Sequence, residues 1–440
     1  MVTDILARDP AALLTRLASV VPGVDLARAR VVRAPGRVNL IGEHTDYNLG
    51  FVLPVAIDLG ISIALVATDD RRVELTLAAT GERDGFDLDA IGGRQGRWID
   101  YVAGTAWALA EAGIATRGFR GLLASDLPAG AGLSSSAALE LAAAWALCGG
   151  EEPPLPRMQL AQVAQRAENA YVGVNSGLMD QFASAFGEAG HALLLDCRSL
   201  EHRAVPLPLD EVALVVCHSG SPRKLERSAY NERRAQCEAA VAAIAAEEPG
   251  VVSLRDVTPA MLGRWGGRLD PIVHRRAEHV VEENARVLAT VEALEAGDLA
   301  EVGRLFAASH ASLASLYDVS SPELDALVGI ASAVDGVVGA RLTGAGFGGS
   351  TINLVRRGRE GALRAAIEAE YTRRTGLAPR VFEVRAAAGA GTMRPDPVRG
   401  SNRQARAPAP ASPGGYPPGR PPATVSRFPR SAGARPRRRR

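Results

Sequence analysis

The sequence predicts an α+β protein with two domains. Its 440 residues are enough for two or three domains, and 47% of them are hydrophobic, which supports a core of substantial size. Strand-like and helical runs follow one another without the strict strand–helix alternation of a parallel sheet. The pattern changes near residue 205, so we predict domains at 1–205 and 206–390 and a tail at 391–440.

The first domain is predicted to begin with strands and to continue with helices. Short apolar runs rich in β-branched residues indicate strands at 31–32, 61–66 and 73–77. Longer stretches, in which Ala and Leu are frequent, then indicate helices at 99–112, 135–147 and 158–171.

The second domain is predicted to contain longer helices between its strands. A strand is expected at 212–217, followed by charged, Ala-rich helices at 224–247, 271–296 and 298–315. Strands at 337–342 and 351–355, a helix at 359–376 and a strand at 381–384 complete this domain.

Residues 391–440 differ in composition from the rest of the chain. They hold 11 of the 27 prolines and 12 Arg against one acid, without hydrophobic periodicity, which predicts a disordered tail. The tail therefore carries +11, and with a whole-chain charge of +1 the first 390 residues carry −10. An acidic body argues against a nucleic-acid groove, so we expect no specific nucleic-acid partner. Contact of the tail with nucleic acid or anionic lipid is the alternative to a dispensable extension.

The cysteines and the apolar segments indicate the compartment. The four cysteines form no C-x-x-C pair and are too few for a disulfide framework, which fits a reducing cytosol. The first ten residues lack the apolar segment of a signal peptide, and no run of 18 apolar residues could span a membrane. We therefore expect a cytoplasmic protein without a membrane partner.

The densest charged cluster lies at residues 33–46, which read RAPGRVNLIGEHTD. Two Arg, a Glu, a His and an Asp surround a Pro-Gly pair that we expect to form a turn. Side chains at this charge density do not build a core, because an unpaired buried charge is costly. Their donors and acceptors suit a polyhydroxylated ligand, and a solvated loop is the alternative interpretation.

A glycine-rich loop precedes a helix at residues 128–136, which read PAGAGLSSS. Glycines let backbone N–H groups approach phosphate oxygens, the helix dipole favours negative charge, and serine hydroxyls can donate to phosphate or bind Mg²⁺. A serine cluster that only caps the helix is the alternative. The chain has no G-x-x-x-x-G-K-[ST] motif, so this is not a Walker A loop.

Two carboxylates follow this loop at positions that suit phosphoryl transfer. Glu168 lies near the end of a predicted helix, and Asp180 follows a loop that contains two glycines. A phosphoryl transferase needs a carboxylate on Mg²⁺ and often another near the nucleophile. The alternatives are a solvated helical acid for Glu168 and an N-cap residue for Asp180.

Residues 343–349, TGAGFGG, contain a G-x-G-x-x-G pattern, which makes a nicotinamide-dependent enzyme the rival hypothesis. That pattern should open a helix, whereas this one continues into the β-rich TINLV at 351–355. We therefore predict a tight loop between strands whose backbone approaches a ligand or the other domain. The sequence has no H-E-x-x-H, no G-x-S-x-G and no Cys/His cluster, which excludes the common metal-site and hydrolase motifs.

Together these motifs resemble those of the GHMP small-molecule kinases, and within that superfamily those of the galactokinase family. Residues 34–54 closely resemble the family's sugar-binding signature, residues 128–137 the superfamily's ATP loop, and residues 343–349 its third motif. The resemblance implies a ribosomal-S5-domain-2-like N-terminal domain and a ferredoxin-like C-terminal domain, with the site in the cleft between them.

The resemblance also implies a role for each matching residue. Asp180 matches the catalytic base, and Arg37 matches the residue that stabilises the developing charge. The sugar-binding positions are Glu43, His44, Thr45, Asp46 and Tyr230. The ATP loop consists of Gly130, Ala131, Gly132, Leu133, Ser134, Ser135 and Ser136. Ser136 and Glu168 match the Mg²⁺ ligands.

The reaction that this resemblance implies is transfer of the γ-phosphate of ATP to the C1 hydroxyl of α-D-galactose in galactose catabolism. Catalysis would rest on positioning and charge neutralisation, with Arg37 stabilising charge as it forms. A kinase for a related sugar, such as N-acetylgalactosamine or arabinose, is one alternative. A catalytically inactive sugar-and-ATP sensor is another, although such proteins interrupt the Ser-rich loop and this loop is continuous. We expect a monomer.

Overall fold

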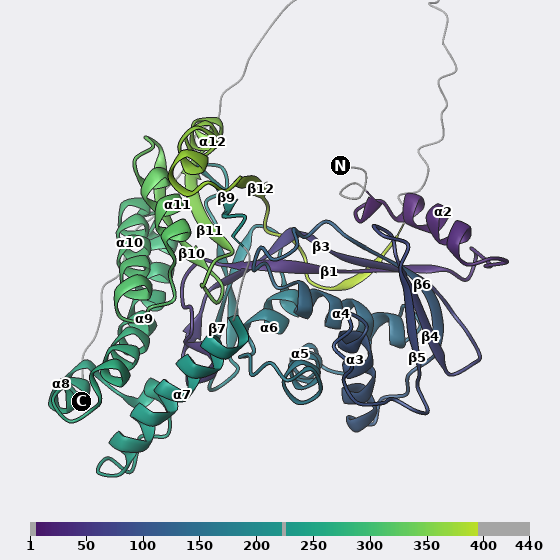
Figure 1. Ribbon diagram of the computed structural model, residues 1–440, viewed down its shortest axis with the longest axis horizontal. Coiled ribbons are helices and arrows are strands. Elements are labelled where there is room, and N and C mark those ends of the chain that lie inside the picture. The colour runs from purple at the N-terminus through teal and green to yellow at the C-terminus, as the bar shows by residue number, and fades with distance from the viewer. Residues whose placement is uncertain (1–5, 222–225, 395–440) are drawn as a thin grey trace, which may run out of the picture. The chain divides into compact units, whose positions relative to one another are not determined.

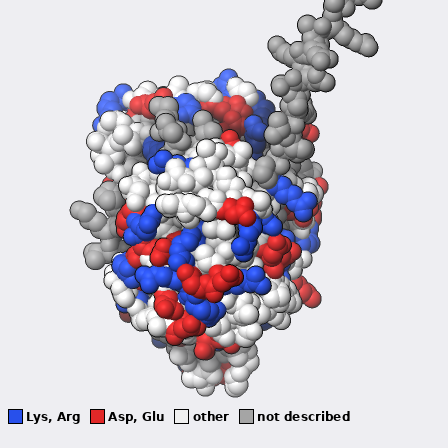
Figure 2. Space-filling model, turned by 90° about the vertical axis from the view of Figure 1, so that its right-hand side faces the viewer, with Lys and Arg blue, Asp and Glu red and all other residues white. Residues whose placement is uncertain are grey.

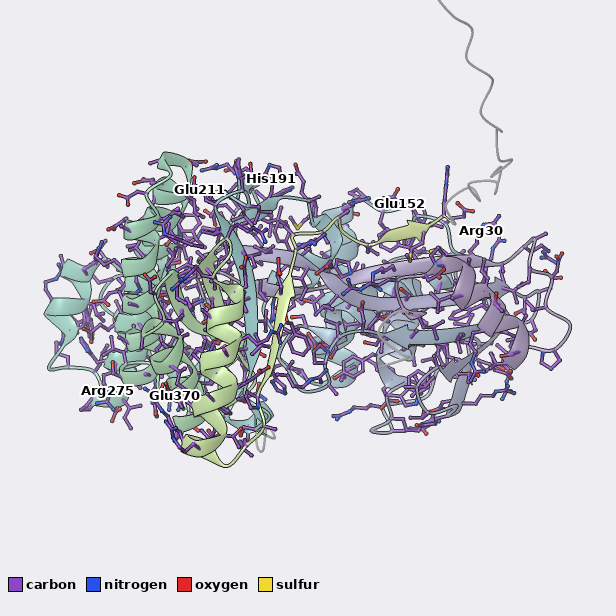
Figure 3. The ribbon with its side chains drawn as sticks, turned by 90° about the horizontal axis from the view of Figure 1, so that it is seen from above. Arg30, Glu152, His191, Glu211, Arg275 and Glu370 are labelled. Atoms are coloured by element: carbon purple, nitrogen blue, oxygen red, sulfur yellow. The ribbon has the colours of Figure 1, made fainter. Side chains whose placement is uncertain are left out.

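The computed structural model describes residues 6–221 and 226–394, which form one compact unit with the predicted mixture of helices and strands. The tail predicted at 391–440 lies outside the described residues from residue 395 onward. Figures 1 and 3 show two sheets along the long axis of the molecule, each with its own helices.

The first sheet has six strands in the order β13-β1-β3-β6-β4-β5. All neighbours are antiparallel except β4 and β6, which are parallel. The strands are β1 (Arg30–Asn39), β3 (Pro54–Ala67), β4 (Arg72–Leu77), β5 (Arg83–Asp87), β6 (Phe119–Ser125) and β13 (Gly391–Met393).

Helices cover both faces of this sheet because its strands alternate apolar side chains between two cores. In β3, Ile63 and Leu65 belong to the main core, whereas Ala64 belongs to a smaller cluster under α2. The helices of this half are α2 (Pro10–Val20), α3 (Asp100–Glu111), α4 (Ser135–Leu147), α5 (Arg157–Arg166) and α6 (Met179–Phe186). In Figure 1, α2 lies above the sheet and α3 to α6 lie below it.

A small sheet adjoins the first one, with β7 (His191–Asp196) between β2 (Phe51–Val52) and β8 (His202–Pro206). Three single turns complete the helical elements: η1 (Asp46–Asn48) and η3 (Leu254–Asp256) are 3₁₀ turns, and η2 (Ala167–Val172) is a π-helical turn. The π turn occupies the end of the helix predicted at 158–171. Such turns in place of α-helix are frequent at functional sites.

The second sheet is antiparallel, in the order β10-β11-β9-β12. Its strands are β9 (Val212–His218), β10 (Val337–Thr343), β11 (Ser350–Arg356) and β12 (Arg380–Val384). Its helices are α7 (Glu226–Ala245), α8 (Pro259–Trp265), α9 (Pro271–Ala296), α10 (Leu299–Ser315), α11 (Pro322–Ser332) and α12 (Glu360–Thr375). Every residue of β9 is buried, since apolar clusters lie on both of its faces.

The Pro-Gly pair at 35–36 does not form the predicted turn. β1 runs through it, and the strand register shifts between Pro35 and Arg37, as in a β-bulge. A side chain at position 36 would place its Cβ 2.5 Å from the carbonyl oxygen of Leu133, so only glycine fits there. The bulge keeps the strand continuous and brings Arg37 against the glycine-rich loop.

The loop at 344–349 confirms the prediction of a tight connection between strands. Thr343 ends β10 and pairs with Ser350, the first residue of β11. Gly344, Gly346, Gly348 and Gly349 all have positive φ angles, which explains why the turn is so rich in glycine. The loop opens no helix, so the nicotinamide-binding interpretation loses its structural context.

The end of the folded body needs a correction. Ala386 forms a bridge with Ile57, and residues 391–393 pair with β1 as β13, so the predicted tail begins at least three residues too early. Local composition did not reveal this short strand because it is defined by its partner on the first sheet.

No helix among the described residues has both the length and the apolar character needed to cross a bilayer. Figure 2 shows a face on which acidic and basic side chains alternate rather than forming a patch of one sign.

Candidate active site

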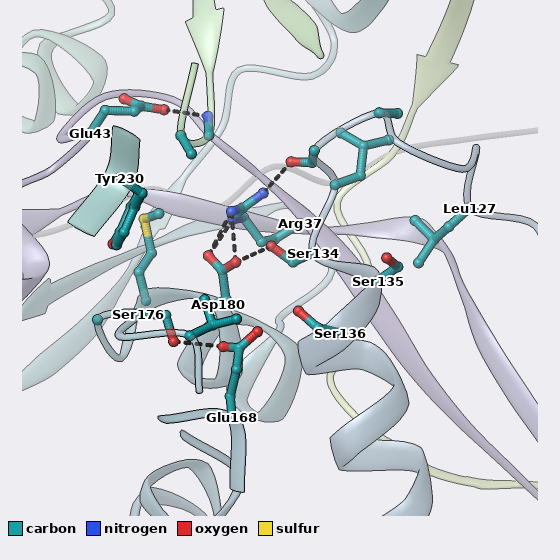
Figure 4. Close-up of a pocket in the computed structure, with 18 of the residues that line it drawn as sticks. Arg37, Glu43, Leu127, Ser134, Ser135, Ser136, Glu168, Ser176, Asp180 and Tyr230 are labelled. Atoms are coloured by element: carbon teal, nitrogen blue, oxygen red, sulfur yellow. Dashed lines mark hydrogen bonds and ion pairs between the residues drawn. The ribbon is translucent and has the colours of Figure 1, made fainter. Parts of the chain in front are cut away.

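A cavity of about 500 Å³ lies between the two halves of the described chain. Its walls come from the end of β1 with η1, the glycine-rich loop, η2 with α6, and Tyr230 and the 344–345 segment of the second half. All the residues predicted for the site line this cavity except Thr45. Figure 4 shows most of them facing one another.

Arg37 and Asp180 meet at the centre of the cavity, although they are 143 positions apart in the sequence. The guanidinium donates from Nε to Oδ1 at 2.7 Å and from Nη2 to Oδ2 at 2.8 Å, which is the bidentate geometry of a strong pair. The Arg37 side chain is 6% exposed and that of Asp180 is 23% exposed. The carboxylate therefore stays accessible to a ligand, whereas the arginine is fixed.

The glycine-rich loop is attached to this pair through its backbone. The Arg37 Nη1 donates to the Gly132 carbonyl at 2.7 Å, and the Arg37 N–H donates to the Leu133 carbonyl at 3.1 Å. The Ser350 hydroxyl donates to the Ala131 carbonyl at 2.7 Å. No side chain caps the N-terminus of α4, so the positive end of this helix faces the cavity without a protein acceptor from its cap residue.

The two predicted Mg²⁺ ligands lie next to each other. The Ser136 hydroxyl hydrogen-bonds the Glu168 carboxylate, whose Oε2 also accepts from Ser176 at 2.6 Å and from Gln181 at 2.9 Å. Burial raises the pKa of Glu168, and these hydrogen bonds oppose the shift.

These ligands suit Mg²⁺ that arrives with a nucleotide. Among the described residues, no group of three or more His, Cys, Asp or Glu side chains could hold a metal alone. Mg²⁺ prefers hard oxygen ligands and usually binds through one or two carboxylates together with substrate phosphates. One carboxylate and one hydroxyl beside the glycine-rich loop fit this requirement.

Tyr230 lies on the side of the cavity away from α4, as Figure 4 shows, and Asp46 lines the cavity close enough for its charge to act on Tyr230. The Asp46 carboxylate accepts hydrogen bonds from the backbone N–H groups of Tyr47, at 3.0 Å, and Met179. Burial raises the pKa of Asp46 to about 6, and the nearby Asp180 charge adds to the shift. A Cβ at Gly177 would lie 1.9 Å from Asp46 Oδ2, so glycine is required for the carboxylate to sit there.

His44 is held by a chain of hydrogen bonds whose direction can be deduced. Its Nε2 lies 3.2 Å from the Ala345 carbonyl, which can only accept, so Nε2 carries the proton. Nδ1 must then accept from the Tyr47 hydroxyl at 2.9 Å, which accepts from the Tyr317 hydroxyl at 2.7 Å. Burial lowers the pKa of His44 to about 3, so the ring is neutral.

Glu43 belongs to a buried network that joins the two halves of the molecule. Its carboxylate forms an ion pair with Arg341 of β10 and accepts from the Gly344 N–H at 3.1 Å, as Figure 4 shows for the latter. Glu283 of α9 accepts from the Gly42 N–H at 3.0 Å and from Arg286 at 2.6 Å. Burial raises the pKa of Glu43, and Arg341 opposes this shift.

Thr45 is the predicted site residue that the structure does not bring to the cavity. Its side chain is fully buried, and its hydroxyl oxygen lies 2.8 Å from the carbonyl oxygen of Gly42 and 2.6 Å from that of Phe51, so its one proton is donated to a protein carbonyl. The Thr45 side chain therefore lies behind the cavity wall, and its expected place among the sugar ligands stays a prediction.

The cavity also includes residues of the third motif, whose backbone was expected to approach a ligand or the other domain, and two residues that the sequence did not single out. The third motif contributes Gly344 and Ala345, and the loop before α6 contributes Ser176, which hydrogen-bonds Glu168. Tyr101 of α3 lines the cavity as well. An aromatic residue on an otherwise ordinary apolar helix carries no sequence signal, so Tyr101 could be found only in three dimensions.

Three family models match separate parts of the chain. They are the galactokinase galactose-binding signature at residues 23–66, the GHMP kinases N terminal domain at 100–188 and the GHMP kinases C terminal model at 290–373. A curated galactokinase from Roseiflexus sp. is 48% identical over 363 residues, which cover 82% of this chain and 93% of that protein. A galactokinase from Chloroflexus aurantiacus is 47% identical over 348 residues, covering 79% and 89% respectively.

Solved structures show the same likeness. The Lactococcus lactis galactokinase complexed with galactose superposes with a TM-score of 0.83 at 36% identity, covering 87% of this chain and 99% of that chain. The Methanococcus jannaschii mevalonate kinase superposes with a TM-score of 0.58 at 20% identity, covering 83% of this chain and 100% of the other. The second likeness concerns the fold alone.

Proposed function

Since the chain belongs to the galactokinase family of the GHMP kinases, we propose that its cavity binds galactose and ATP together and that Arg37 and Asp180 act where the two ligands meet. The chain has the GHMP kinase fold and is an ATP-dependent sugar kinase. Its reaction transfers the γ-phosphate of ATP to the C1 hydroxyl of galactose, giving galactose 1-phosphate and ADP.

The bidentate Arg37–Asp180 pair is the observation that supports the assignment of roles. Asp180 is the more accessible member of the pair. It can therefore accept the proton of the C1 hydroxyl as the oxygen attacks the γ-phosphate. Arg37 is fixed between Asp180 and the glycine-rich loop, where a positive charge stabilises the oxyanion and the transferring phosphoryl group. Both groups are positioned before the ligands bind.

The nucleotide is assigned to the loop at 130–136 and the N-terminus of α4. The carbonyls of residues 131–133 are engaged by Ser350 and Arg37 and so point away from the place of an anion. Ser136 and Glu168 would hold the Mg²⁺ of Mg-ATP, and this ion supplies charge neutralisation on the phosphates when bound.

The sugar is assigned to the opposite end of the cavity. Asp46 and Tyr230 offer polar atoms there, and Glu43 and His44 line the same wall. Both nitrogens of His44 and much of the Glu43 carboxylate already have protein partners. We therefore assign Asp46 the main role in binding a sugar hydroxyl, with His44 and Glu43 shaping the wall.

The compartment and the oligomeric state are also part of the proposal. The four cysteines are free thiols, which is consistent with a reducing compartment, and we propose that the enzyme acts in the cytoplasm as a monomer.

A panel of sugars tests the proposed substrate. ADP release should be measured with galactose, glucose, N-acetylgalactosamine, arabinose and, as a non-sugar substrate of the same fold, mevalonate. A site built from buried polar partners discriminates strongly against a ligand that leaves them unpaired, so galactose should have by far the highest kcat/KM. Equal or better use of another member would refute galactose as the substrate, and no turnover with any member would refute a kinase.

A further inference from the structure

Ser134 adopts a backbone conformation that an L-residue normally avoids. Its φ and ψ angles are 58° and 51°, in the left-handed region, and the residue is 7% exposed. It stands at the N-cap of α4, where a serine usually takes extended angles and accepts a hydrogen bond from the first turn, but its side chain makes no such bond. Strain of this kind persists only where the surrounding structure imposes it, and it concentrates at functional sites.

The strained backbone directs the Ser134 hydroxyl at the proposed base. Its Oγ donates to Asp180 Oδ2 at 2.5 Å, as Figure 4 shows. The other two serines of the loop are placed differently: Ser135 is exposed, and Ser136 hydrogen-bonds Glu168. Of these three serines, Ser134 is the one that contacts the reacting carboxylate.

The donors on Asp180 fill most of its capacity. Nε of Arg37 donates to Oδ1, while Nη2 of Arg37 and Oγ of Ser134 both donate to Oδ2. Nη2 of Arg37 also lies 2.7 Å from Oδ1, so the arginine contacts both carboxylate oxygens, whereas the Ser134 hydroxyl binds Oδ2 alone. Oδ1 is thus the oxygen that Ser134 does not occupy, which makes it the one that a sugar hydroxyl can approach.

The Ser134 hydroxyl cannot donate its proton to a nucleotide phosphate and to Asp180 at the same time. A hydroxyl has one proton to donate, and an ionised carboxylate can only accept, so the Ser134 proton is committed to Asp180. The three preceding residues are fixed through their carbonyls to Arg37 and Ser350, so the loop itself holds Ser134 in place.

We propose that Ser134 is a positioning residue for the base Asp180 and not a phosphate ligand. Its hydroxyl binds Oδ2 and leaves Oδ1 to face the C1 hydroxyl. This hydrogen bond connects the ATP loop directly to the catalytic carboxylate. This inference rests on the proposed function, because it takes Asp180 as the base.

Two substitutions test the proposal, Ser134→Ala and Ser134→Gly. Both remove the hydroxyl, and the glycine also removes the strain of a positive φ. Loss of a hydrogen bond to a charged group should lower kcat by roughly 10-fold or more in both variants. KM for ATP and the Kd for ADP, measured by calorimetry with Mg²⁺ present, should stay within about twofold of the unsubstituted chain, because phosphate contacts remain. Ser315→Ala, at an exposed serine far along the chain in α10, is the matched control.

The opposite pattern would overturn the proposal. A rise in the Kd for ADP and in KM for ATP with kcat retained would make Ser134 a phosphate ligand. Full activity in Ser134→Gly but not in Ser134→Ala would show that backbone strain and not the hydroxyl decides the effect, and normal parameters in both would leave Ser134 without a role.

A double substitution separates this proposal from the proposed function. If Ser134 acts through Asp180, adding Ser134→Ala to Asp180→Asn should cause no further loss of kcat, whereas independent effects would multiply and contradict the proposal. The proposed function fails in a different way, through normal turnover in Asp180→Asn alone or absence of galactose turnover in the unsubstituted chain.

Discussion

At the scale of single residues, burial decides how the polar groups of the site behave. His44 and Asp46 are neighbours in the signature, and both are buried in the cavity wall. Burial lowers the pKa of His44 to about 3 and raises that of Asp46 to about 6. His44 is therefore neutral at any ordinary pH, whereas Asp46 gains or loses its charge close to physiological pH. The sequence identified both residues but not this difference, which depends on the surrounding packing.

Galactose binding should consequently weaken in mild acid. As pH falls through about 6, Asp46 takes up a proton and becomes a poorer acceptor for a sugar hydroxyl, so KM for galactose should rise, while KM for ATP changes less. The measurement is KM for galactose as a function of pH between about pH 5 and 8. An ordinary Asp, with a pKa of about 3.9, would not titrate in this range. Asp46→Asn should have a higher KM that no longer rises below pH 6. A flat KM for galactose in the folded, unsubstituted protein would contradict the assignment.

The same group affects stability with the opposite sign. The folded-state pKa of Asp46 lies above the ordinary value of 3.8, so the folded chain binds this proton more tightly than the unfolded chain does. The contribution of Asp46 to the free energy of unfolding is therefore greatest in acid and is lost as pH rises from about 4 to about 6. With rising pH, the contribution of Asp46 to stability decreases while galactose binding is expected to strengthen. The pH dependence of Tm therefore cannot replace the measurement of KM for galactose.

At the scale of elements, the sequence predicted those whose signal is local. Helix α4 has the predicted bounds, 135–147, and so does α9, at 271–296, because Ala-rich and amphipathic patterns define a helix within its own segment. The prediction of a turn at 35–36 was wrong. The Pro-Gly pair has the composition of a turn, but pairing with β3 keeps it within strand β1. The π-helical η2 depends on packing around Glu168 and could not be predicted from helical periodicity.

Two elements, α4 and η2, together should determine the Mg²⁺ concentration that the enzyme needs for half activity. Ser136 comes from the first turn of α4 and Glu168 from η2, and these two side chains would hold the metal. Glu168→Gln removes a charged hard ligand and Ser136→Ala a neutral one, so both should raise the Mg²⁺ concentration for half activity, Glu168→Gln more. Mn²⁺ binding in the presence of ADP, followed by electron paramagnetic resonance, gives a readout without turnover. Glu188→Gln, at an exposed acid, is the control; an unaltered metal dependence in both site variants would place the ion elsewhere.

At the scale of the whole molecule, the second half completes the site that the first half begins. Arg341 is fully buried, pairs with Glu43 and donates to the Leu40 carbonyl at 2.8 Å. Burying an unpaired Glu43 would be costly, so this pairing holds the segment that contains Glu43 against β10. Arg341 lies two residues before the third motif and has no signal of its own, since its partner is about 300 positions away in the sequence. Motifs predicted the chemistry of the site, but not the residues that support it from the other half.

Two truncations test where the folded body ends. Removing residues 395–440 takes away 11 Arg and one Asp, so the isoelectric point should fall while Tm, kcat and KM stay close to those of the full chain. Removing residues 391–440 also deletes β13, which pairs with Val31, Val32 and Arg33, and should lower Tm by several degrees with kcat largely kept. Calorimetric melts of the two truncated chains decide this. Equal Tm values would show that β13 adds nothing, and loss of activity in the shorter truncation would show that the removed segment supports the body.

The central claim is that Asp180, held by Arg37, removes the proton from the C1 hydroxyl of galactose, and Asp180→Asn tests it most directly. The amide keeps the shape of the side chain but cannot accept that proton. Turnover with saturating galactose and ATP should fall by about 10²–10⁴-fold, the usual contribution of a general base. Galactose and ADP, measured by calorimetry, should still bind with affinities close to those of the unsubstituted chain. A folded Asp180→Asn protein with near-normal kcat would contradict the account.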